Sequence, residues 1–319
     1  MIKIYVLEDE HLVEEQHASG IIKFDNAAWI DIANPTQEEE WLIENHFGIA
    51  IPNITEIDDI EVSRRLYSEN ETHYLTAYIL SSGEAEHFQS NSVRFILLNS
   101  VLITVRYVEI GSFTEIQNLI VQQSKYSSEQ VLLCLLKSAM YHFADILEQI
   151  GFNIDLQTKS ILNPKADANI KNDFRIILQN IGRNGDATSK AREGLISINR
   201  LITYIIQDQD FSDILKDQMA ILAKDINALN DHTFFLSNQI NFLLEATLGM
   251  INIEQNIAIK VFSVASMMFL PPTLIASAYG MNFAHIPGLH WKYGYIIVMI
   301  LMIVSSYLPY KYFRKRGWF

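Results

Sequence analysis

Two apolar stretches near the C-terminal end of the chain constrain its fold more than any other feature. The first covers about residues 257–278 and the second about residues 293–312. A helix of about 20 residues, with a rise of about 1.5 Å per residue, matches the roughly 30 Å hydrocarbon core of a bilayer. A short loop, residues 283–290, separates the two stretches. The sequence therefore predicts a helical membrane hairpin, preceded by a water-soluble portion.

Charge is divided unevenly along the chain. Residues 256–319 contain six Lys or Arg and no Asp or Glu, so residues 1–255 hold the other 18 basic residues and all 37 acidic ones. The formal charge of −19 on this larger portion disfavours nucleic acid as a partner, because phosphate groups need a basic surface. Divalent cations suit such a surface better, although an acidic surface also simply keeps a protein soluble.

The basic residues predict the orientation of the hairpin. Four of them follow or end the second apolar stretch, whereas the loop at 283–290 has none; they are Lys311, Arg314, Lys315 and Arg316. The positive-inside rule then places the basic tail, residues 314–319, in the cytoplasm and the loop outside. Since two spans return the chain to its starting side, we expect the N-terminal portion in the cytoplasm as well.

Two further observations agree with a cytoplasmic location. The first residues of the chain show no secretory pattern, because their apolar run is short and ends in acidic residues. Cys134 is the single cysteine, so no disulfide can form within the chain, as suits a reducing compartment.

Residues 1–127 are predicted to form a mixed α/β domain, which makes the soluble portion α+β overall. Two β-rich runs, 93–98 and 101–107, flank a two-residue polar turn and predict a hairpin. Residues 73–80 alternate as a strand would. Thr36 is the expected N-cap of a helix, with Glu39 at the capping-box position.

Residues 128–255 are predicted to be helical. A long helix should run from Ser128 to about residue 162, where a proline follows, and a second should cover about 169–207, with a possible interruption near 182–185. The third, a stalk helix over about 211–255, meets no proline before Pro271. We therefore expect it to continue into the first span as one rod roughly 100 Å long.

The membrane portion is divided by the same reasoning. We expect a first span over 256–280, an external loop over 281–291 and a second span over 292–313, before the basic tail. Each span has the length of a transmembrane helix.

The stalk helix carries a heptad seam. Its residues are spaced alternately by four and three positions: Leu222, Ile226, Leu229, Thr233, Leu236, Ile240, Leu243, Thr247 and Met250. Sustained spacing of this kind favours self-association or a long helical partner. The alternative is one face of an ordinary amphipathic helix that packs on its own domain.

One face of the first span has polar ends and an apolar middle. It comprises Asn256, Ile259, Phe262, Ser263, Ser266, Leu270, Thr273 and Ser277. A single chain with two spans cannot enclose an aqueous path, so a conducting protein would need several copies with this pore stripe lining the path. Each residue also has an ordinary alternative: an amide that caps, an apolar side chain that packs, or a hydroxyl bonded to its own helix.

The spans and their loop lack Asp and Glu. A site that strips water from a divalent ion should offer charged oxygen ligands. An ion that passes these spans would therefore stay largely hydrated, with Asn and Thr oxygens binding its outer water, and Mg²⁺ fits best because it gives up water reluctantly. Ile259, Phe262 and Leu270 would then gate the path by dewetting.

The motif Tyr279-Gly280-Met281-Asn282-Phe283 follows a proline-bearing span and precedes a short loop and one more span. This arrangement resembles the CorA family of magnesium transporters. Residues 251–256, 269–277 and 308–313 are similar to the enterobacterial-type magnesium/cobalt members, and the specific likeness covers about residues 224–319. The N-terminal portion agrees mainly in organisation.

The resemblance implies a funnel-shaped homopentamer in the inner (cytoplasmic) membrane, whose first span lines a pore for Mg²⁺ and also Co²⁺ and Ni²⁺. Gly280, Met281 and Asn282 would form the selectivity filter, with a ring of Asn282 binding hydrated Mg²⁺. It also implies that intracellular Mg²⁺, bound between cytoplasmic domains, closes the channel. Asp225 is our candidate for a regulatory ligand, and no cofactor besides Mg²⁺ is implied.

The loop departs from the common family pattern. Related loops often have Met-Pro-Glu after the motif, whereas this chain has Ile286-Pro287-Gly288, which is similar to zinc-transporting relatives. His285 and His290 could contact a softer ion, although loop histidines are more often simply solvated. The missing carboxylate would lower the cation concentration at the mouth of the pore.

Three functions therefore stay open: a Mg²⁺ channel, a Zn²⁺- or Co²⁺-preferring transporter of the same fold, and a membrane-anchored sensor or scaffold that does not conduct. We do not expect an enzyme, because the sequence has no phosphate-binding loop and no nucleophile–base signature.

Overall fold

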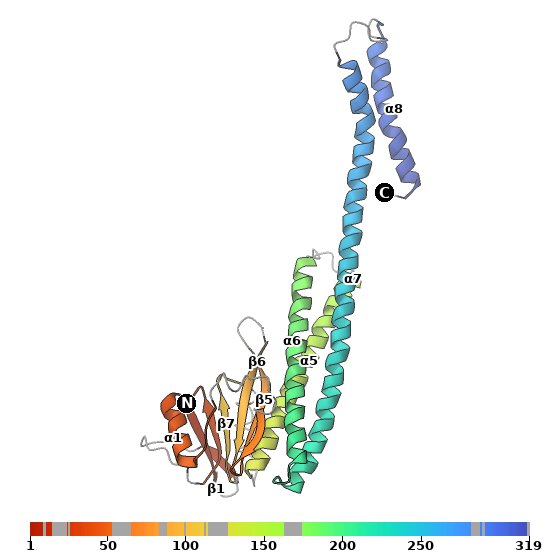
Figure 1. The fold of residues 1–319 in the computed structure, drawn as a ribbon. Coiled ribbons are helices and arrows are strands. Elements are labelled where there is room, and N and C mark those ends of the chain that lie inside the picture. The colour runs from red at the N-terminus through yellow and green to blue at the C-terminus, as the bar shows by residue number, and fades with distance from the viewer. Residues whose placement is uncertain are drawn as a thin grey trace. The chain divides into compact units, whose positions relative to one another are not determined.

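The computed structural model divides the chain into two compact units (Figure 1). The N-terminal unit is Met1–Leu244 and the C-terminal unit is Glu245–Phe319. Helix α7, Asp213–Tyr279, belongs to both units. The structure describes residues 1–8, 11–14, 24, 26–52, 65–82, 88–98, 100–111, 113, 127–162, 174–281, 288 and 291–317.

A seven-stranded sheet organises the N-terminal unit. Its order is β2-β1-β3-β7-β6-β5-β4, and every pair is antiparallel except β3 with β7. The strands are β1 (Ile2–Glu8), β2 (His11–Glu14), β3 (Ala27–Ala33), β4 (Leu66–Glu69), β5 (Thr72–Ser82), β6 (Phe88–Leu97) and β7 (Leu102–Arg106). The predicted strand at 73–80 and the hairpin that became β6 and β7 are confirmed.

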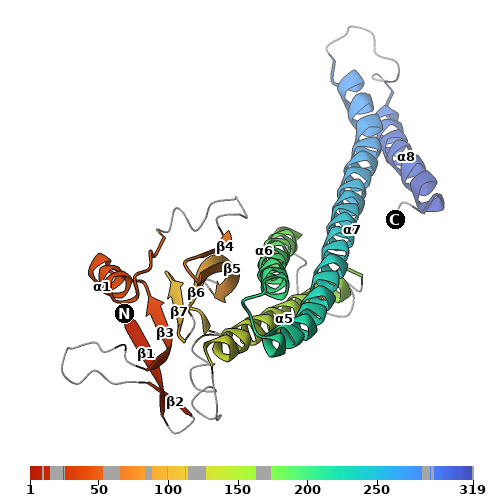
Figure 2. The same ribbon diagram turned by 60° about the horizontal axis from the view of Figure 1, so that its bottom comes forward.

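Helices cover both faces of this sheet. Helix α1 (Gln37–Phe47) packs Ile43 into a core with Ile30, Ile103 and other apolar residues of the sheet. Helices α5 (Ser128–Leu162) and α6 (Phe174–Gln207) cover the other face, as both views show (Figures 1 and 2). Helix α6 is continuous, so the interruption that we allowed for near 182–185 is absent from it.

The start of α1 forms as its sequence predicts. The Thr36 hydroxyl accepts a hydrogen bond from Glu39 N at 3.3 Å, and the Glu39 carboxylate accepts one from Thr36 N at 2.9 Å. The helix ends at Gly48, whose φ of 67° suits a residue without a Cβ. The capping box is therefore confirmed, and it satisfies backbone donors that would otherwise lack partners.

A buried ionic network fixes the one parallel strand pair. Asp31 of β3 and Arg106 of β7 are almost fully buried, and Arg106 Nη2 lies 3.0 Å from Asp31 Oδ2. Thr104 donates to Asp31 Oδ1 at 2.8 Å, and Trp29 Nε1 donates to Thr104 at 3.0 Å. Because a shifted register would leave a buried charge unpaired, this network favours a single alignment of β3 with β7.

The heptad seam of α7 packs within its own chain. In the N-terminal unit, Leu222, Ile226, Leu236 and Leu243 are at most 1% exposed. Leu236 lies beside Gly151 of α5, and Ile240 lies beside Gly185 of α6. The expectation that this part of the seam mediates self-association is therefore wrong: periodic apolar spacing shows that a helix needs an apolar partner, and here α5 and α6 supply it.

Gly194 of α6 allows a close junction between three elements. A Cβ added at this position would overlap the ring of Phe143 on α5 and lie 3.0 Å from the carbonyl oxygen of Tyr78 on β5. Phe143 is 1% exposed and cannot move aside into solvent. The absence of a side chain at Gly194 thus sets how closely α5 and α6 approach the sheet.

We expect Gly194→Ala to lower the free energy of unfolding by about 1–3 kcal/mol, because an overpacked core must shift. Gly182→Ala, at an exposed α6 position with open space around it, is the control and should stabilise the helix by about 0.5–1 kcal/mol. Thermal unfolding of the full-length variants in detergent measures both. Equal effects of the two substitutions would contradict this packing.

Candidate functional site

Two of the long helices expose apolar surface that the chain itself does not cover. Among the described residues, α5, α7 and α8 (Gly294–Lys315) are long and apolar enough to cross a membrane. The apolar window of α5 is 56% buried within the chain, whereas those of α7 and α8 are only 6% buried. Helix α5 is therefore a core helix, and the apolar windows of α7 and α8 need lipid or other copies of the chain around them.

In the C-terminal unit, α8 lies beside the last part of α7 (Figures 1 and 2). One face of α7 is covered there: Val264 is 1% exposed, and Met268, Pro271 and Ile275 are half-buried. These positions recur every three or four residues, so they share one side of the helix. Since α8 is the other helix described in this unit, this is the face that α8 covers.

The pore stripe lies on the opposite face of α7. At about 100° per residue, its eight positions point on average about half a turn away from the face that α8 covers. All eight are exposed in the single chain: Asn256, Ile259, Phe262, Ser263, Ser266, Leu270, Thr273 and Ser277. The large apolar members among them have exposed fractions of 53% for Ile259, 74% for Phe262 and 66% for Leu270.

Two hydroxyls of the stripe donate to their own helix. Ser263 donates to the carbonyl oxygen of Ile259 at 2.8 Å. Thr273 donates to the carbonyl oxygens of Phe269 at 3.0 Å and Leu270 at 2.9 Å. This is the ordinary alternative noted for these residues, but it leaves the lone pairs of each hydroxyl oxygen available. Because the hydrogen is used, each oxygen presents an acceptor rather than a donor to its surroundings.

The structure describes part of the Gly-Met-Asn motif. Helix α7 ends at Tyr279, and Gly280 N donates to Ala276 O at 2.9 Å. A Cβ at Gly280 would lie only 3.1 Å from that same oxygen, so glycine suits this helix end. Met281 is half-exposed. Asn282, His285 and His290 lie outside the described residues, and their roles stay predictions.

Asp225 is exposed on α7. Among the residues that the structure describes, it belongs to no group of three or more His, Cys, Asp or Glu side chains placed to share a metal ion. Its regulatory role stays a prediction.

One such group exists in the N-terminal unit, and sequence reasoning missed it. It consists of His73 on β5 and Asp208 and Asp210 in the turn between α6 and α7. In the sequence, Asp208 and Asp210 are recognisable only as part of an acidic turn. No local spacing connects them to a histidine in a distant strand, and only the fold brings the three together.

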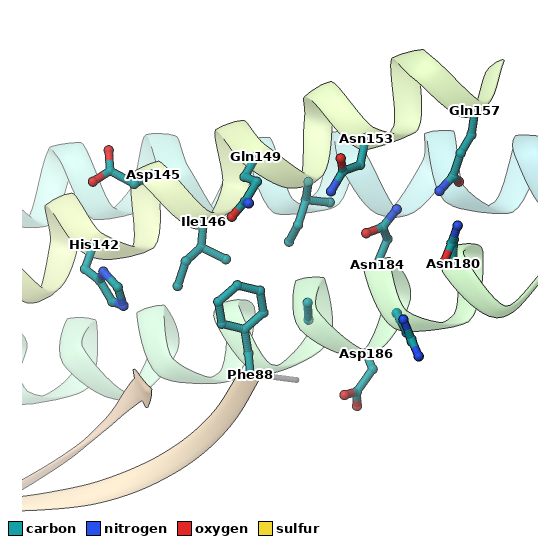
Figure 3. Close-up of a pocket in the computed structure, with 13 residues that line it drawn as sticks. Phe88, His142, Asp145, Ile146, Gln149, Asn153, Gln157, Asn180, Asn184 and Asp186 are labelled. Atoms are coloured by element: carbon teal, nitrogen blue, oxygen red, sulfur yellow. The ribbon is translucent and has the colours of Figure 1, made fainter. Parts of the chain in front are cut away.

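A cavity of 670 Å³ lies between α5 and α6 (Figure 3). Amide side chains from both helices point into it, among them Asn153, Gln157 and Asn184 (Figure 3). Gln157 Oε1 and Asn184 Nδ2 are buried without a protein partner. Buried polar atoms of this kind are normally satisfied by water, so we expect water in this space of the N-terminal unit.

Comparison with known proteins identifies the family. The family model described as "CorA-like Mg2+ transporter protein" matches residues 24–315. The chain belongs to the CorA family. Among curated CorA relatives, the magnesium transport protein CorA of Haemophilus influenzae is 32% identical and that of Escherichia coli K12 is 29% identical, each covering 100% of both chains.

Solved structures share the fold. The complete CorA magnesium transporter of Methanocaldococcus jannaschii gives a TM-score of 0.80 at 18% identity, covering 100% of this chain and 99% of that one. The full-length CmaX protein gives 0.65 at 13% identity, covering 98% and 97%. The predicted fold class, an α+β soluble domain followed by a long helix and two C-terminal helices, is confirmed. As a CorA-family chain, this protein is a membrane protein, and α7 and α8 are the helices able to span the bilayer.

Proposed function

We propose that this chain forms a channel through which Mg²⁺ enters the cell as a hydrated ion. The observation that carries the proposal is the pore stripe, exposed on the side of α7 opposite α8. The curated relatives are named magnesium transport proteins, which supports the same ion.

The assembly that this requires has several copies, and the family resemblance suggests five. Each copy contributes α7 to an inner ring with the stripe toward the axis, while α8 faces lipid outside it. The basic residues after the second span favour cytoplasmic placement of both termini. The protein then lies in the inner membrane with the loop between α7 and α8 outside.

The chemistry of the lining suits an ion that keeps its water. The water molecules around a cation point their hydrogens outward, so the path must offer hydrogen-bond acceptors. The carbonyl oxygens of Asn282 and Asn256 are such acceptors, and so is the Thr273 hydroxyl oxygen, whose hydrogen is already donated to the helix. Neutral acceptors hold a hydrated ion weakly enough for it to leave again.

Apolar residues of the stripe supply the gate. Rings of Ile259, Phe262 and Leu270 would exclude water from a narrow path and block a hydrated ion until the ring widens. The membrane potential drives entry, at about 2.3 kcal/mol per charge per 100 mV. Intracellular Mg²⁺ would close the path by bridging acidic N-terminal units, with Asp225 as a candidate ligand.

One observation favours a second candidate ion. The loop sequence Ile286-Pro287-Gly288 lacks the carboxylate common in related loops and is flanked by two histidines. Imidazole nitrogens suit Zn²⁺ and Co²⁺ better than Mg²⁺, so these residues favour a Zn²⁺- or Co²⁺-preferring transporter. A flux competition in one liposome preparation separates the two. Inhibition of Zn²⁺ flux by millimolar Mg²⁺ supports the magnesium channel, and its absence supports the alternative.

We expect Asn282→Ala to abolish Mg²⁺ uptake, because the filter would lose the carbonyl oxygens that accept from hydration water. Uptake is measured with a Mg²⁺-sensitive dye in liposomes, and size-exclusion chromatography checks that the oligomer is intact. Asn238→Ala, at an exposed α7 position in the N-terminal unit, is the matched control and should conduct normally. Undiminished uptake by Asn282→Ala would refute its place at the pore mouth, and an intact, flux-free wild-type oligomer would support a sensor or scaffold.

We also expect Thr273→Cys to react with a charged, water-soluble thiol reagent, since its side chain would line a wet path. The background is Cys134→Ser, which removes the single native cysteine. Ile303→Cys on α8, where the native side chain is 65% exposed, should stay unmodified because lipid surrounds it. Mass spectrometry of both variants in liposomes measures the reaction, and an unreactive Thr273→Cys would place the stripe in lipid.

A further inference from the structure

His73 is a buried side chain with an unsatisfied nitrogen. It is 6% exposed, and its Nδ1 atom has no hydrogen-bond partner. The backbone holds it firmly, because β5 pairs it with Ser68 of β4 on one side and Leu97 of β6 on the other. The ring of Phe211 packs against it at 4.5 Å between centroids. A buried polar atom without a partner is costly, and in a native fold such an atom is normally satisfied by water, an ion or another ligand.

Two carboxylates face this imidazole from the turn between α6 and α7. Asp208 Oδ2 lies 3.5 Å from His73 Nδ1, and Asp210 Oδ2 lies 3.9 Å from His73 Nε2. Neither contact is a hydrogen bond. One ligand atom from each of the three residues can be chosen so that all lie within 4.8 Å of one another.

The separation of His73 Nδ1 and Asp208 Oδ2 fits two ligands of one metal ion, whereas the 3.9 Å contact of Asp210 is with the other ring nitrogen and does not belong to the same comparison. Ligand atoms at about 2.1 Å around a tetrahedral zinc-like ion are about 3.4 Å apart, close to the 3.5 Å between His73 and Asp208. Ligands around octahedral Mg²⁺ are about 2.9 Å apart. The spacing therefore suits the tetrahedral geometry more closely.

Asp208 is oriented by its neighbours, as ligands of metal sites usually are. Its Oδ1 accepts from Asp210 N at 3.2 Å. The Tyr204 hydroxyl hydrogen-bonds with both Asp208 and Ser68. Because an ionised carboxylate can only accept, the phenol O–H is the donor to Asp208, and this hydrogen bond holds the carboxylate in place.

A water-accessible space leads to the cluster. A cavity of 410 Å³ is lined by His73 and Asp210 together with Glu71, Ser128 and Glu129. The Glu129 carboxylate accepts hydrogen bonds from Ser212 N, at 3.1 Å, and from the Ser212 hydroxyl. It therefore holds the α6–α7 turn against α5, and we do not count it among the metal ligands. The space admits an ion and leaves room for water as a further ligand.

We propose that His73, Asp208 and Asp210 form a metal site in the N-terminal unit that binds a first-row transition divalent cation, of the class of Zn²⁺, Co²⁺ and Ni²⁺. An imidazole nitrogen combined with carboxylates suits these ions, whereas Mg²⁺ prefers oxygen alone. The bound ion would tie the turn that precedes α7 to the central sheet. This site is separate from the conduction path and does not depend on the proposed channel.

The test is a titration of the full-length protein in detergent with CoCl₂, in millimolar MgCl₂, by calorimetry and visible absorption. The wild type should bind one Co²⁺ per chain that the Asp208→Asn and His73→Gln variants do not bind. Loss of a group that only supports a metal ligand lowers metal affinity about 10–100-fold. Asp210 is proposed as a ligand itself, so Asp210→Asn should lower Co²⁺ affinity by at least about 10-fold. Asp231→Asn and His232→Gln, both exposed on α7, are the matched controls and should bind as the wild type does.

Each outcome decides the proposal. Unchanged Co²⁺ binding in Asp208→Asn and Asp210→Asn would overturn it and leave His73 and Asp208 as a simple ion pair. Co²⁺ binding that appears only when MgCl₂ is left out would overturn the transition-metal class. Asp210→Asn keeps the test valid if His73→Gln fails to fold, because the Asp210 side chain is 69% exposed. Binding is read without any flux, so failure of the channel proposal would not alter it.

Discussion

The absence of carboxylates from the membrane portion governs the rest of the proposed mechanism. Residues 256–319 contain no Asp or Glu, although the chain as a whole has 37. Stripping water from a divalent ion is expensive unless charged oxygens replace it. The stripe of α7 offers hydroxyl and amide oxygens beside large apolar side chains, so it can pass a hydrated ion and dry out when narrowed. All 37 acidic residues precede residue 256, where we propose that they sense the ion rather than conduct it.

The two metal environments that we propose differ in their chemistry. The conduction path would touch water through neutral oxygens on an exposed helix face, whereas the His73 site would bind a metal directly through a buried nitrogen and two carboxylates. The Gly194 junction packs α6 closely against the backbone of β5 at Tyr78, and the buried Asp31–Arg106 pair aligns β3 with β7 in the same sheet. Such preorganisation is what separates a metal site from a chance cluster of acidic residues.

Local signals in the sequence predicted local structure well. The capping box at Thr36, the β6–β7 hairpin and the start of α5 at Ser128 each follow from a few adjacent residues. The heptad seam of α7 predicted its packing partner less well. Its spacing indicates that the helix needs an apolar partner, but not whether α5, α6 or another chain provides it. The His73 cluster could not be predicted, since its members meet only when the sheet and the α6–α7 turn are assembled. The pore stripe needed only helical periodicity, and its exposure opposite α8 is consistent with the predicted role.

The central claim is that several copies of α7 surround a water-filled path and turn the stripe toward it. A cryo-electron microscopy reconstruction of the full-length protein in lipid nanodiscs with Mg²⁺ tests this most directly. We expect a closed ring of α7 helices with Thr273, Leu270 and Asn256 toward the axis and α8 against lipid. A ring with these side chains toward lipid, or a carboxylate bound to a dehydrated ion within the bilayer, would contradict the claim.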